Sequence, residues 1–210
     1  MTGAGAARSS SVKQLVLASS NPGKIREIRA LVATLGIEVI PQSHYAVPEA
    51  DEPYASFLEN ALAKARNACN YAGLPALADD SGLCVDALLG GPGVHSARIA
   101  GEPRSDARNN ARLLELLAST EQRRAHYYCV MVLLRHAADP QPLVAEGEWH
   151  GEILRSPRGE GGFGYDPLFL DPLLGKTGAE LPLAEKNRIS HRGRALNVLL
   201  NRLASTVHTV

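Results

Sequence analysis

The stretch LVLASSNPGKIREI, Leu15–Ile28, reads as an apolar strand, a polar turn and the start of an amphipathic helix. The apolar run predicts a buried strand over residues 14–19. Asn21 is a favourable helix N-cap, and Pro22 suits the first helical turn. Apolar residues then recur every three to four positions, which predicts a helix over residues 22–35 that a glycine ends. The first half of the chain continues to alternate strands and helices, which favours an α/β fold.

The turn in this stretch is similar to a phosphate-binding loop but lacks two of its defining residues. Ala18 stands where a Walker loop has its first glycine, and Ile25 stands where the loop has Ser or Thr after its lysine. Lys24 is expected in the first helical turn, where the helix dipole disfavours a cation, and this favours a nearby anion. The alternative is that Lys24 points to solvent and Asn21 only caps the helix.

The composition is that of a globular protein with balanced charge. The chain has 210 residues, 45% of them hydrophobic, with 22 basic and 22 acidic side chains. This length allows a sizeable core in one domain. A net charge of zero gives no overall field for a polyanion, so we expect no stable nucleic-acid partner.

The three cysteines, Cys69, Cys84 and Cys129, are odd in number and widely spaced. They favour a reducing compartment over a disulfide framework or zinc site, each thiol being a small core residue. The first residues lack the apolar region of a secretory signal, so we expect residues 1–12 to be disordered and residues 13–210 to form one domain. The longest apolar run, Cys129 to Leu134, is too short to span a bilayer, which favours a cytoplasmic protein without membrane attachment.

The remaining elements indicate a mixed α/β protein around a long, partly antiparallel sheet. A capping box predicts a helix from Ser56 to Tyr71. Further helices are expected over residues 105–118 and 190–203. Further strands are expected over residues 38–40, in the segment that ends at Asp79 and Asp80, and over residues 125–135, 143–149 and 151–154.

Asp79 and Asp80 follow an apolar strand and precede Ser81 and Gly82. Because side chains alternate along a strand, at most one of the two carboxylates is expected to face a given cleft unless the strand breaks there. Carboxylates together with substrate phosphates are typical ligands of Mg²⁺, and α/β folds place ligands at strand ends. The alternative is a turn in which Asp79 and Ser81 cap backbone groups.

Two further clusters combine residue types that bind nucleotides. Glycines surround Phe163 in the segment before Tyr165 and Asp166. Glycines allow the backbone to approach a ligand closely, and Phe and Tyr rings can stack on a purine. The alternative is a flexible hairpin loop that covers the core. A basic segment with Lys186, Arg188, His191 and Arg192 leads into the last expected helix; it is either a solvated face or, because cations are disfavoured at a helix start, an anion site.

Five ordered motifs resemble the inosine triphosphate pyrophosphatase family from Lys13 onward: LASSNPGKIREI, SFLENALAKA, LADDSGLCVDALLGGPGVHSARIAG, GGFGYDPLF and EKNRISHRGRAL. Members of this family hydrolyse ITP, dITP and XTP to the monophosphate and pyrophosphate. The resemblance implies an elongated α/β fold with two lobes and an active-site cleft between them. It also implies a homodimer, a purine nucleoside triphosphate as substrate, and dependence on Mg²⁺.

The resemblance also assigns roles to residues. Asp80 would be the general base and a metal ligand, with Asp79 beside it, and Glu52 would be the second metal ligand. The residues implied to bind substrate are Ser19, Ser20, Asn21, Pro22, Gly23, Lys24 and Lys64 at the phosphates, Ser81, Phe163, Gly164, Tyr165 and Asp166 at the base and sugar, Lys186 at the nucleotide, and His191 and Arg192 at the 6-oxo edge.

This chain departs from the family pattern at two places. Ser19-Ser20 stands where the family often has Thr-Gly, and the acidic loop reads Glu52-Pro53-Tyr54-Ala55-Ser56-Phe57 where the family often has Glu-Thr-Gly-x-Thr-Phe. Glu49 is therefore the alternative metal ligand. Two other functions stay open: a non-catalytic nucleotide-binding regulatory protein, and a pyrophosphatase for pyrimidine or modified nucleotides.

Overall fold

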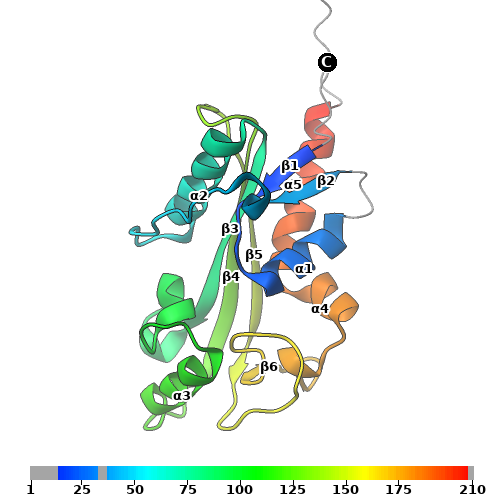
Figure 1. The fold of residues 1–210 in the computed structure, drawn as a ribbon. Coiled ribbons are helices and arrows are strands. Elements are labelled where there is room, and N and C mark those ends of the chain that lie inside the picture. The colour runs from blue at the N-terminus through cyan, green and yellow to red at the C-terminus, as the bar shows by residue number, and fades with distance from the viewer. Residues whose placement is uncertain (1–13, 33–36, 208–210) are drawn as a thin grey trace, which may run out of the picture.

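The fold is built on one long mixed sheet with helices on both faces (Figure 1). The computed structural model describes residues 14–32 and 37–207. Within them the strands are β1 (Gln14–Leu17), β2 (Glu38–Pro41), β3 (Ala76–Val85), β4 (Arg124–Leu134), β5 (Leu143–Ile153), β6 (Phe169–Asp171) and β7 (Lys176–Thr177). Their order across the sheet is β2-β1-β3-β4-β5-β6-β7. β1 pairs parallel with β2 and β3, whereas the other pairs are antiparallel, which confirms the expected mixed sheet.

The helices agree largely with the local signals in the sequence. They are α1 (Pro22–Val32), α2 (Phe57–Ala72), α3 (Asp106–Leu116), α4 (Leu183–Ile189) and α5 (His191–Val207). The Ser56 side chain accepts a hydrogen bond from Glu59 N, which confirms Ser56 as the N-cap of α2. The Glu59 carboxylate accepts from the Ser56 hydroxyl rather than from its backbone amide as a capping box requires. Ser105 likewise caps α3. The expected end of the first helix, at residues 35 and 36, and the expected disordered segment, residues 1–12, lie outside the described residues.

Two expectations about strands were wrong, and one helix was missed. β3 does not end at Asp79 and Asp80 but continues to Val85, because its second half pairs with β4. The two expected strands over residues 143–149 and 151–154 are the single strand β5, in which Gly151 pairs with Ala125. A separate helix, α4, precedes α5 and was not predicted.

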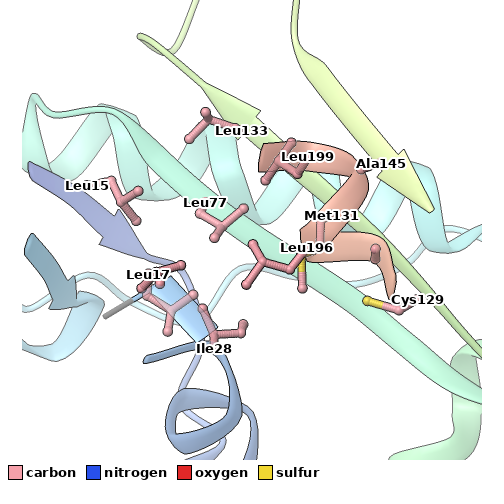
Figure 2. Close-up of a cluster of buried hydrophobic side chains, with 12 residues drawn as sticks. Leu15, Leu17, Ile28, Leu77, Cys129, Met131, Leu133, Ala145, Leu196 and Leu199 are labelled. Atoms are coloured by element: carbon pink, nitrogen blue, oxygen red, sulfur yellow. The ribbon is translucent and has the colours of Figure 1, made fainter. Parts of the chain in front are cut away.

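Two apolar cores cover the opposite faces of one half of the sheet. On one face Leu77 and Met131 pack against Leu196 of α5 and Ile28 of α1 (Figure 2). On the other face the alanines of α2 pack against alternate residues of β3 and β4. Cys69, Cys84 and Cys129 are free and buried, which confirms their expected role as small core residues.

The other half of the sheet has its own core, so two lobes share the long strands. This core is aromatic and contains Tyr127, Trp149 and Phe169. In Figure 1, β1, β2, α1, α2 and α5 lie around one half of β3–β5, whereas α3 and β6 lie around the other half. Among the described residues, no helix is long and apolar enough to cross a bilayer.

Because β1 is short, part of β3 has no neighbouring strand on one side, at the junction of the two lobes. Leu17, the last residue of β1, pairs with Leu77, and the next bridge on this side of β3 joins Cys84 to Pro92. Between these two points β3 runs without a neighbouring strand on that side. The segment without a neighbour contains both aspartates, Asp79 and Asp80.

Gly147 allows α5 to lie directly on β5. A Cβ atom at this position would come 2.2 Å from the carbonyl oxygen of His191 and 2.5 Å from the amide nitrogen of Ala195, both of which are backbone atoms. We therefore expect Gly147→Ala to lower the free energy of unfolding by about 1–3 kcal/mol, measured by guanidinium denaturation. The exposed residue Glu152 of the same strand provides a control, since Glu152→Ala is expected to change that free energy by less than about 0.5 kcal/mol. Equal effects of the two substitutions would contradict the assigned contact.

Candidate active site

A cleft of about 340 Å³ lies between the two lobes, beside the uncovered part of β3. It brings together most residues that the sequence singled out. Its lining includes Ser19, Ser20, Asn21, Lys24, Glu49, Glu52, Lys64, Asp79, Asp80, Ser81, Phe163, Gly164, Tyr165, Asp166, Lys186, His191 and Arg192. Pro22 and Gly23 do not line it, and Arg188 is an exposed residue of α4 outside it.

The turn between β1 and α1 presents polar groups to the cleft. The Asn21 side-chain oxygen accepts hydrogen bonds from Gly23 N at 2.9 Å and Lys24 N at 3.3 Å, so it caps the helix as expected. The Lys24 ammonium lies 2.9 Å from the Asp79 carboxylate rather than pointing to solvent. The anion that compensates this lysine in the structure thus belongs to the protein itself.

The two neighbouring aspartates point to opposite faces of β3, and yet both line the cleft. Asp79 contacts Lys24 and Arg192, whereas Asp80 contacts Lys64 of α2 at 2.8 Å. The expectation that only one carboxylate would reach the cleft was therefore wrong. Because β1 ends before this point, the cleft reaches both faces of the strand.

Charged neighbours give the two aspartates different proton affinities. Burial alone would raise the pKa of Asp79, but Lys24 and Arg192 outweigh burial and hold the pKa well below its usual range. Burial raises the pKa of Asp80, and the nearby Lys64 only partly offsets the effect. Asp80 is therefore the stronger base of the pair.

Glu27, on α1, joins two cations of the site and was not predicted. Its carboxylate accepts a hydrogen bond from Lys186 Nζ at 2.8 Å and another from Arg192 Nη1. Lys186 also contacts Asp166 at 2.6 Å. The sequence held no local signal for this, because adjacent helix residues do not share a face and Glu27 therefore lies off the apolar stripe of Ile28 and Val32.

Phe163 and the residues after it form the wall of the cleft in the second lobe. The ammonium of Lys186 lies 4.7 Å from the centre of the Phe163 ring, and a Cβ at Gly23 would touch that ring at 2.7 Å. Asp106 accepts a hydrogen bond from Gly164 N at 2.7 Å, which holds the loop to α3. The Tyr165 hydroxyl donates to the carbonyl of Ser96 inside the core, so Tyr165 anchors the loop.

His191 is buried at the start of α5 and carries no charge. Its ring stacks on that of Tyr127 with 4.7 Å between the ring centres, and Nδ1 has no hydrogen-bond partner among the described residues. Burial and the charge of Arg192 hold the pKa of His191 well below its usual value. The neutral ring thus carries one buried polar atom that the described protein groups leave unpaired.

Glu52 and Asp80 converge on one cation. The Lys64 ammonium lies 3.0 Å from a Glu52 oxygen and 2.8 Å from an Asp80 oxygen. Glu49, the alternative ligand, instead accepts a hydrogen bond from Ser20. No group of three or more His, Cys, Asp or Glu side chains suited to a metal occurs among residues 14–32 and 37–207.

The cleft carries no excess of positive charge. Its lining contains seven carboxylates, counting Glu49, Glu52, Asp79, Asp80, Glu102, Asp106 and Asp166, against six lysine and arginine side chains. A polyanionic ligand would therefore need an additional cation. Two carboxylates that converge on one point fit a hard cation such as Mg²⁺, which is bound by one or two carboxylates together with phosphate oxygens.

The fold and the cleft define an α/β protein with a site suited to a phosphorylated ligand. The sequence profile of the Ham1 family matches residues 15–202. The chain belongs to the Ham1 family, in agreement with the resemblance drawn from its motifs.

Named relatives and solved structures agree with this assignment. A dITP/XTP pyrophosphatase of Chromobacterium violaceum is 63% identical over 190 residues, 90% of this chain and 96% of the relative. One of Ralstonia nicotianae is 61% identical over 91% of this chain and 97% of the relative. A HAM1 protein from Coxiella burnetii superposes with a TM-score of 0.85 at 47% identity, covering 91% of this chain and 98% of the other. A nucleoside-triphosphatase / dITP/XTP pyrophosphatase from Mycobacterium abscessus has a TM-score of 0.70 at 43% identity, covering 89% and 98%.

The lowered pKa of Asp79 predicts a specific loss of stability in acid. Ionised Asp79 stabilises the folded state fully above the unfolded value of 3.8, and this contribution is lost as pH falls towards the lower value of the folded state. Between about pH 7 and about pH 3, we expect the free energy of unfolding of the wild type to fall further than that of Asp79→Asn. The difference should be at least about 1 kcal/mol. Guanidinium denaturation across this range measures the difference. Parallel curves would mean that Lys24 and Arg192 do not stabilise the Asp79 carboxylate.

Proposed function

We propose that the protein hydrolyses dITP, ITP and XTP to the nucleoside monophosphate and pyrophosphate. The observation that carries this proposal is the meeting, in one cleft, of the neighbouring carboxylates Asp79 and Asp80, the lysines beside them and the aromatic residue Phe163. Relatives 61–63% identical to this chain carry the name dITP/XTP pyrophosphatase. The family resemblance further supports one domain over residues 13–210, a homodimer and a cytoplasmic location.

Asp80 and Glu52 would hold Mg²⁺ together with the triphosphate. The bound ion would supply positive charge at the phosphate oxygens, which phosphoryl transfer requires. Lys64, which now neutralises both carboxylates, would turn to the phosphates, and Lys24 would neutralise further phosphate charge. The hydroxyls of Ser19 and Ser20 and the turn around Gly23 would hold one side of the same group.

Asp80 is the residue best suited to orient and deprotonate the attacking water. Burial raises the pKa of Asp80 in the protein without metal. A bound Mg²⁺ would lower it, and Asp79 is then the alternative base. Asp79 is tied to Lys24 and Arg192, which lower its pKa and weaken it as a base. Asp79 would instead position the two cations, while water cleaves the bridge between the α and β phosphates.

Selection of the purine would depend on donors around its 6-position. His191, Phe163 and Asp166 all line the cleft, and a neutral His191 ring would donate to a 6-oxo group from the ring nitrogen that carries the proton. Arg192 already donates to Glu27, Asp79 and Ser81, so it would act by holding its neighbours as well as by contact. An adenine amino group would face a donor and leave it unpaired, which is costly.

The main test is pyrophosphate release from a panel of purine and pyrimidine nucleoside triphosphates, with and without Mg²⁺. We expect turnover of dITP and XTP that exceeds turnover of ATP and dTTP, and loss of turnover when the metal is chelated. Binding without turnover would favour a regulatory nucleotide-binding protein. A preference for dTTP or UTP would favour a pyrophosphatase for other nucleotides.

Substitution of each aspartate separates the two assigned roles. We expect Asp80→Asn to lower kcat for dITP by at least about 100-fold, since removal of a general base typically costs this much. Asp79→Asn should reduce kcat less and lower thermal stability more, because Lys24 and Arg192 lose their shared partner. Near wild-type turnover in Asp80→Asn would overturn the assignment of the base.

A further inference from the structure

Arg98 lines the cleft and contacts Glu52, one of the two proposed metal ligands. It ends the short 3₁₀ helix η4 (Gly93–Arg98) of the second lobe and lines the cleft. Its guanidinium lies 3.7 Å from Glu52 of the first lobe, on the carboxylate oxygen that Lys64 does not contact. Arg98 thus reaches across the cleft to one of the two proposed metal ligands.

The backbone that carries Arg98 is held firmly on both sides. Ser96 Oγ accepts a hydrogen bond from Leu83 N at 2.8 Å and donates to the Gly93 carbonyl at 2.6 Å. The Asn109 side chain donates to the Ala97 carbonyl at 2.9 Å and accepts from Ala100 N at 3.1 Å. These bonds fix η4 to β3 and to α3, so the base of the Arg98 side chain has a defined position.

Close packing adds to this anchoring. A Cβ atom at Gly82 would lie 2.2 Å from the carbonyl oxygen of Gly93, so η4 lies directly against β3 only two residues beyond Asp80. The position of Arg98 relative to Asp80 is therefore fixed by the fold.

The Arg98 side chain itself is weakly held. It is 46% exposed, and its two ion pairs, with Glu52 at 3.7 Å and Glu102 at 4.0 Å, are longer than hydrogen bonds. Exposed pairs of this kind contribute little to stability. The guanidinium is therefore free to exchange these partners for a better one at low cost.

We propose that Arg98 binds the leaving pyrophosphate portion of the substrate across the cleft. This inference rests on the proposed hydrolysis of nucleoside triphosphates. A guanidinium matches phosphate oxygens in a two-pronged geometry, and charge-assisted bonds of this kind are stronger than the present contacts. Of the six cations that line the cleft, Lys24, Lys64, Lys186 and Arg192 each have a carboxylate within 3.3 Å, whereas Arg98 has none that close.

The remaining lining cation, Arg104, differs from Arg98 in its partner. Arg104 lies 3.8 Å from Asp106, which holds Gly164 in the wall near the expected base site. Arg98 instead contacts Glu52, which converges with Asp80 on Lys64. Arg98 therefore lies near the proposed metal ligands and the expected phosphate site, whereas Arg104 lies near Phe163 and the expected base site.

The test measures binding of pyrophosphate and of dIMP, with Mg²⁺ present, by titration calorimetry on the wild type, Arg98→Ala and Arg98→Lys. We expect Arg98→Ala to weaken pyrophosphate binding about tenfold or more while dIMP binding changes less than about twofold. Arg98→Lys should restore part of the loss, since it keeps charge without the two-pronged geometry. Arg112, 48% exposed and paired with Glu115 on α3, supplies the control, because Arg112→Ala should bind both ligands like the wild type.

Each other outcome contradicts the assignment. Unchanged pyrophosphate binding in Arg98→Ala would show that Arg98 does not bind the leaving group. Equal weakening of both ligands would show a general effect on the cleft. Unchanged pyrophosphate binding at saturating Mg²⁺, with only the Mg²⁺ requirement increased, would show that Arg98 acts by orienting Glu52. Failure of the proposed function itself would appear separately, as absence of pyrophosphate release by the wild type.

Discussion

The charges buried between α1, β3 and the start of α5 are the constraint on which the two-lobed arrangement depends. Arg192 donates to Glu27 from one prong and to Asp79 from the other, and Lys186 continues the chain from Glu27 to Asp166. These groups come from positions far apart in the sequence, and each would be costly to bury alone. Their mutual compensation therefore fixes the relative positions of both lobes at the cleft.

The same network holds the charged side chains of the cleft in place, while two buried polar atoms beside it keep no hydrogen-bond partner among the described residues. The cations are held by carboxylates, which keeps them in place before a ligand arrives. Asp79 Oδ1 and His191 Nδ1 nevertheless lack hydrogen-bond partners among the described residues, although both atoms are buried. Arg192 and Lys186 are therefore held in place before a ligand binds, whereas Lys64 would have to exchange its carboxylate partners.

Local signals in the sequence were sufficient for much of the fold. The N-cap at Ser56, the cap at Asn21 and the apolar strands each depend on neighbours in the chain, and the structure confirms them. The motifs also indicated which polar clusters meet, and the cleft collects them. The roles of those residues in binding and chemistry remain predictions, since contacts in a protein without ligand do not establish them.

What the sequence did not reveal depends on pairing between distant segments. The continuation of β3 beyond Asp80 follows from its long register with β4, which no local pattern encodes. Glu27 was missed because its partners, Lys186 and Arg192, lie more than 150 residues away. The termination of β1 at Leu17 decides that both aspartates reach one cleft, and it too is a property of the assembled sheet.

The gap left by the short β1 also makes β3 a partly open sheet edge inside the protein. Such an edge can pair with a strand of another chain and start aggregation. Beyond the gap η4 covers this edge, with Ser96 bonded to both the amide and the carbonyl of Leu83, and the Cys84–Pro92 bridge closes it. The wall of the cleft therefore also protects this sheet edge, so loosening η4 would expose the edge to pairing with another chain as well as displace Arg98.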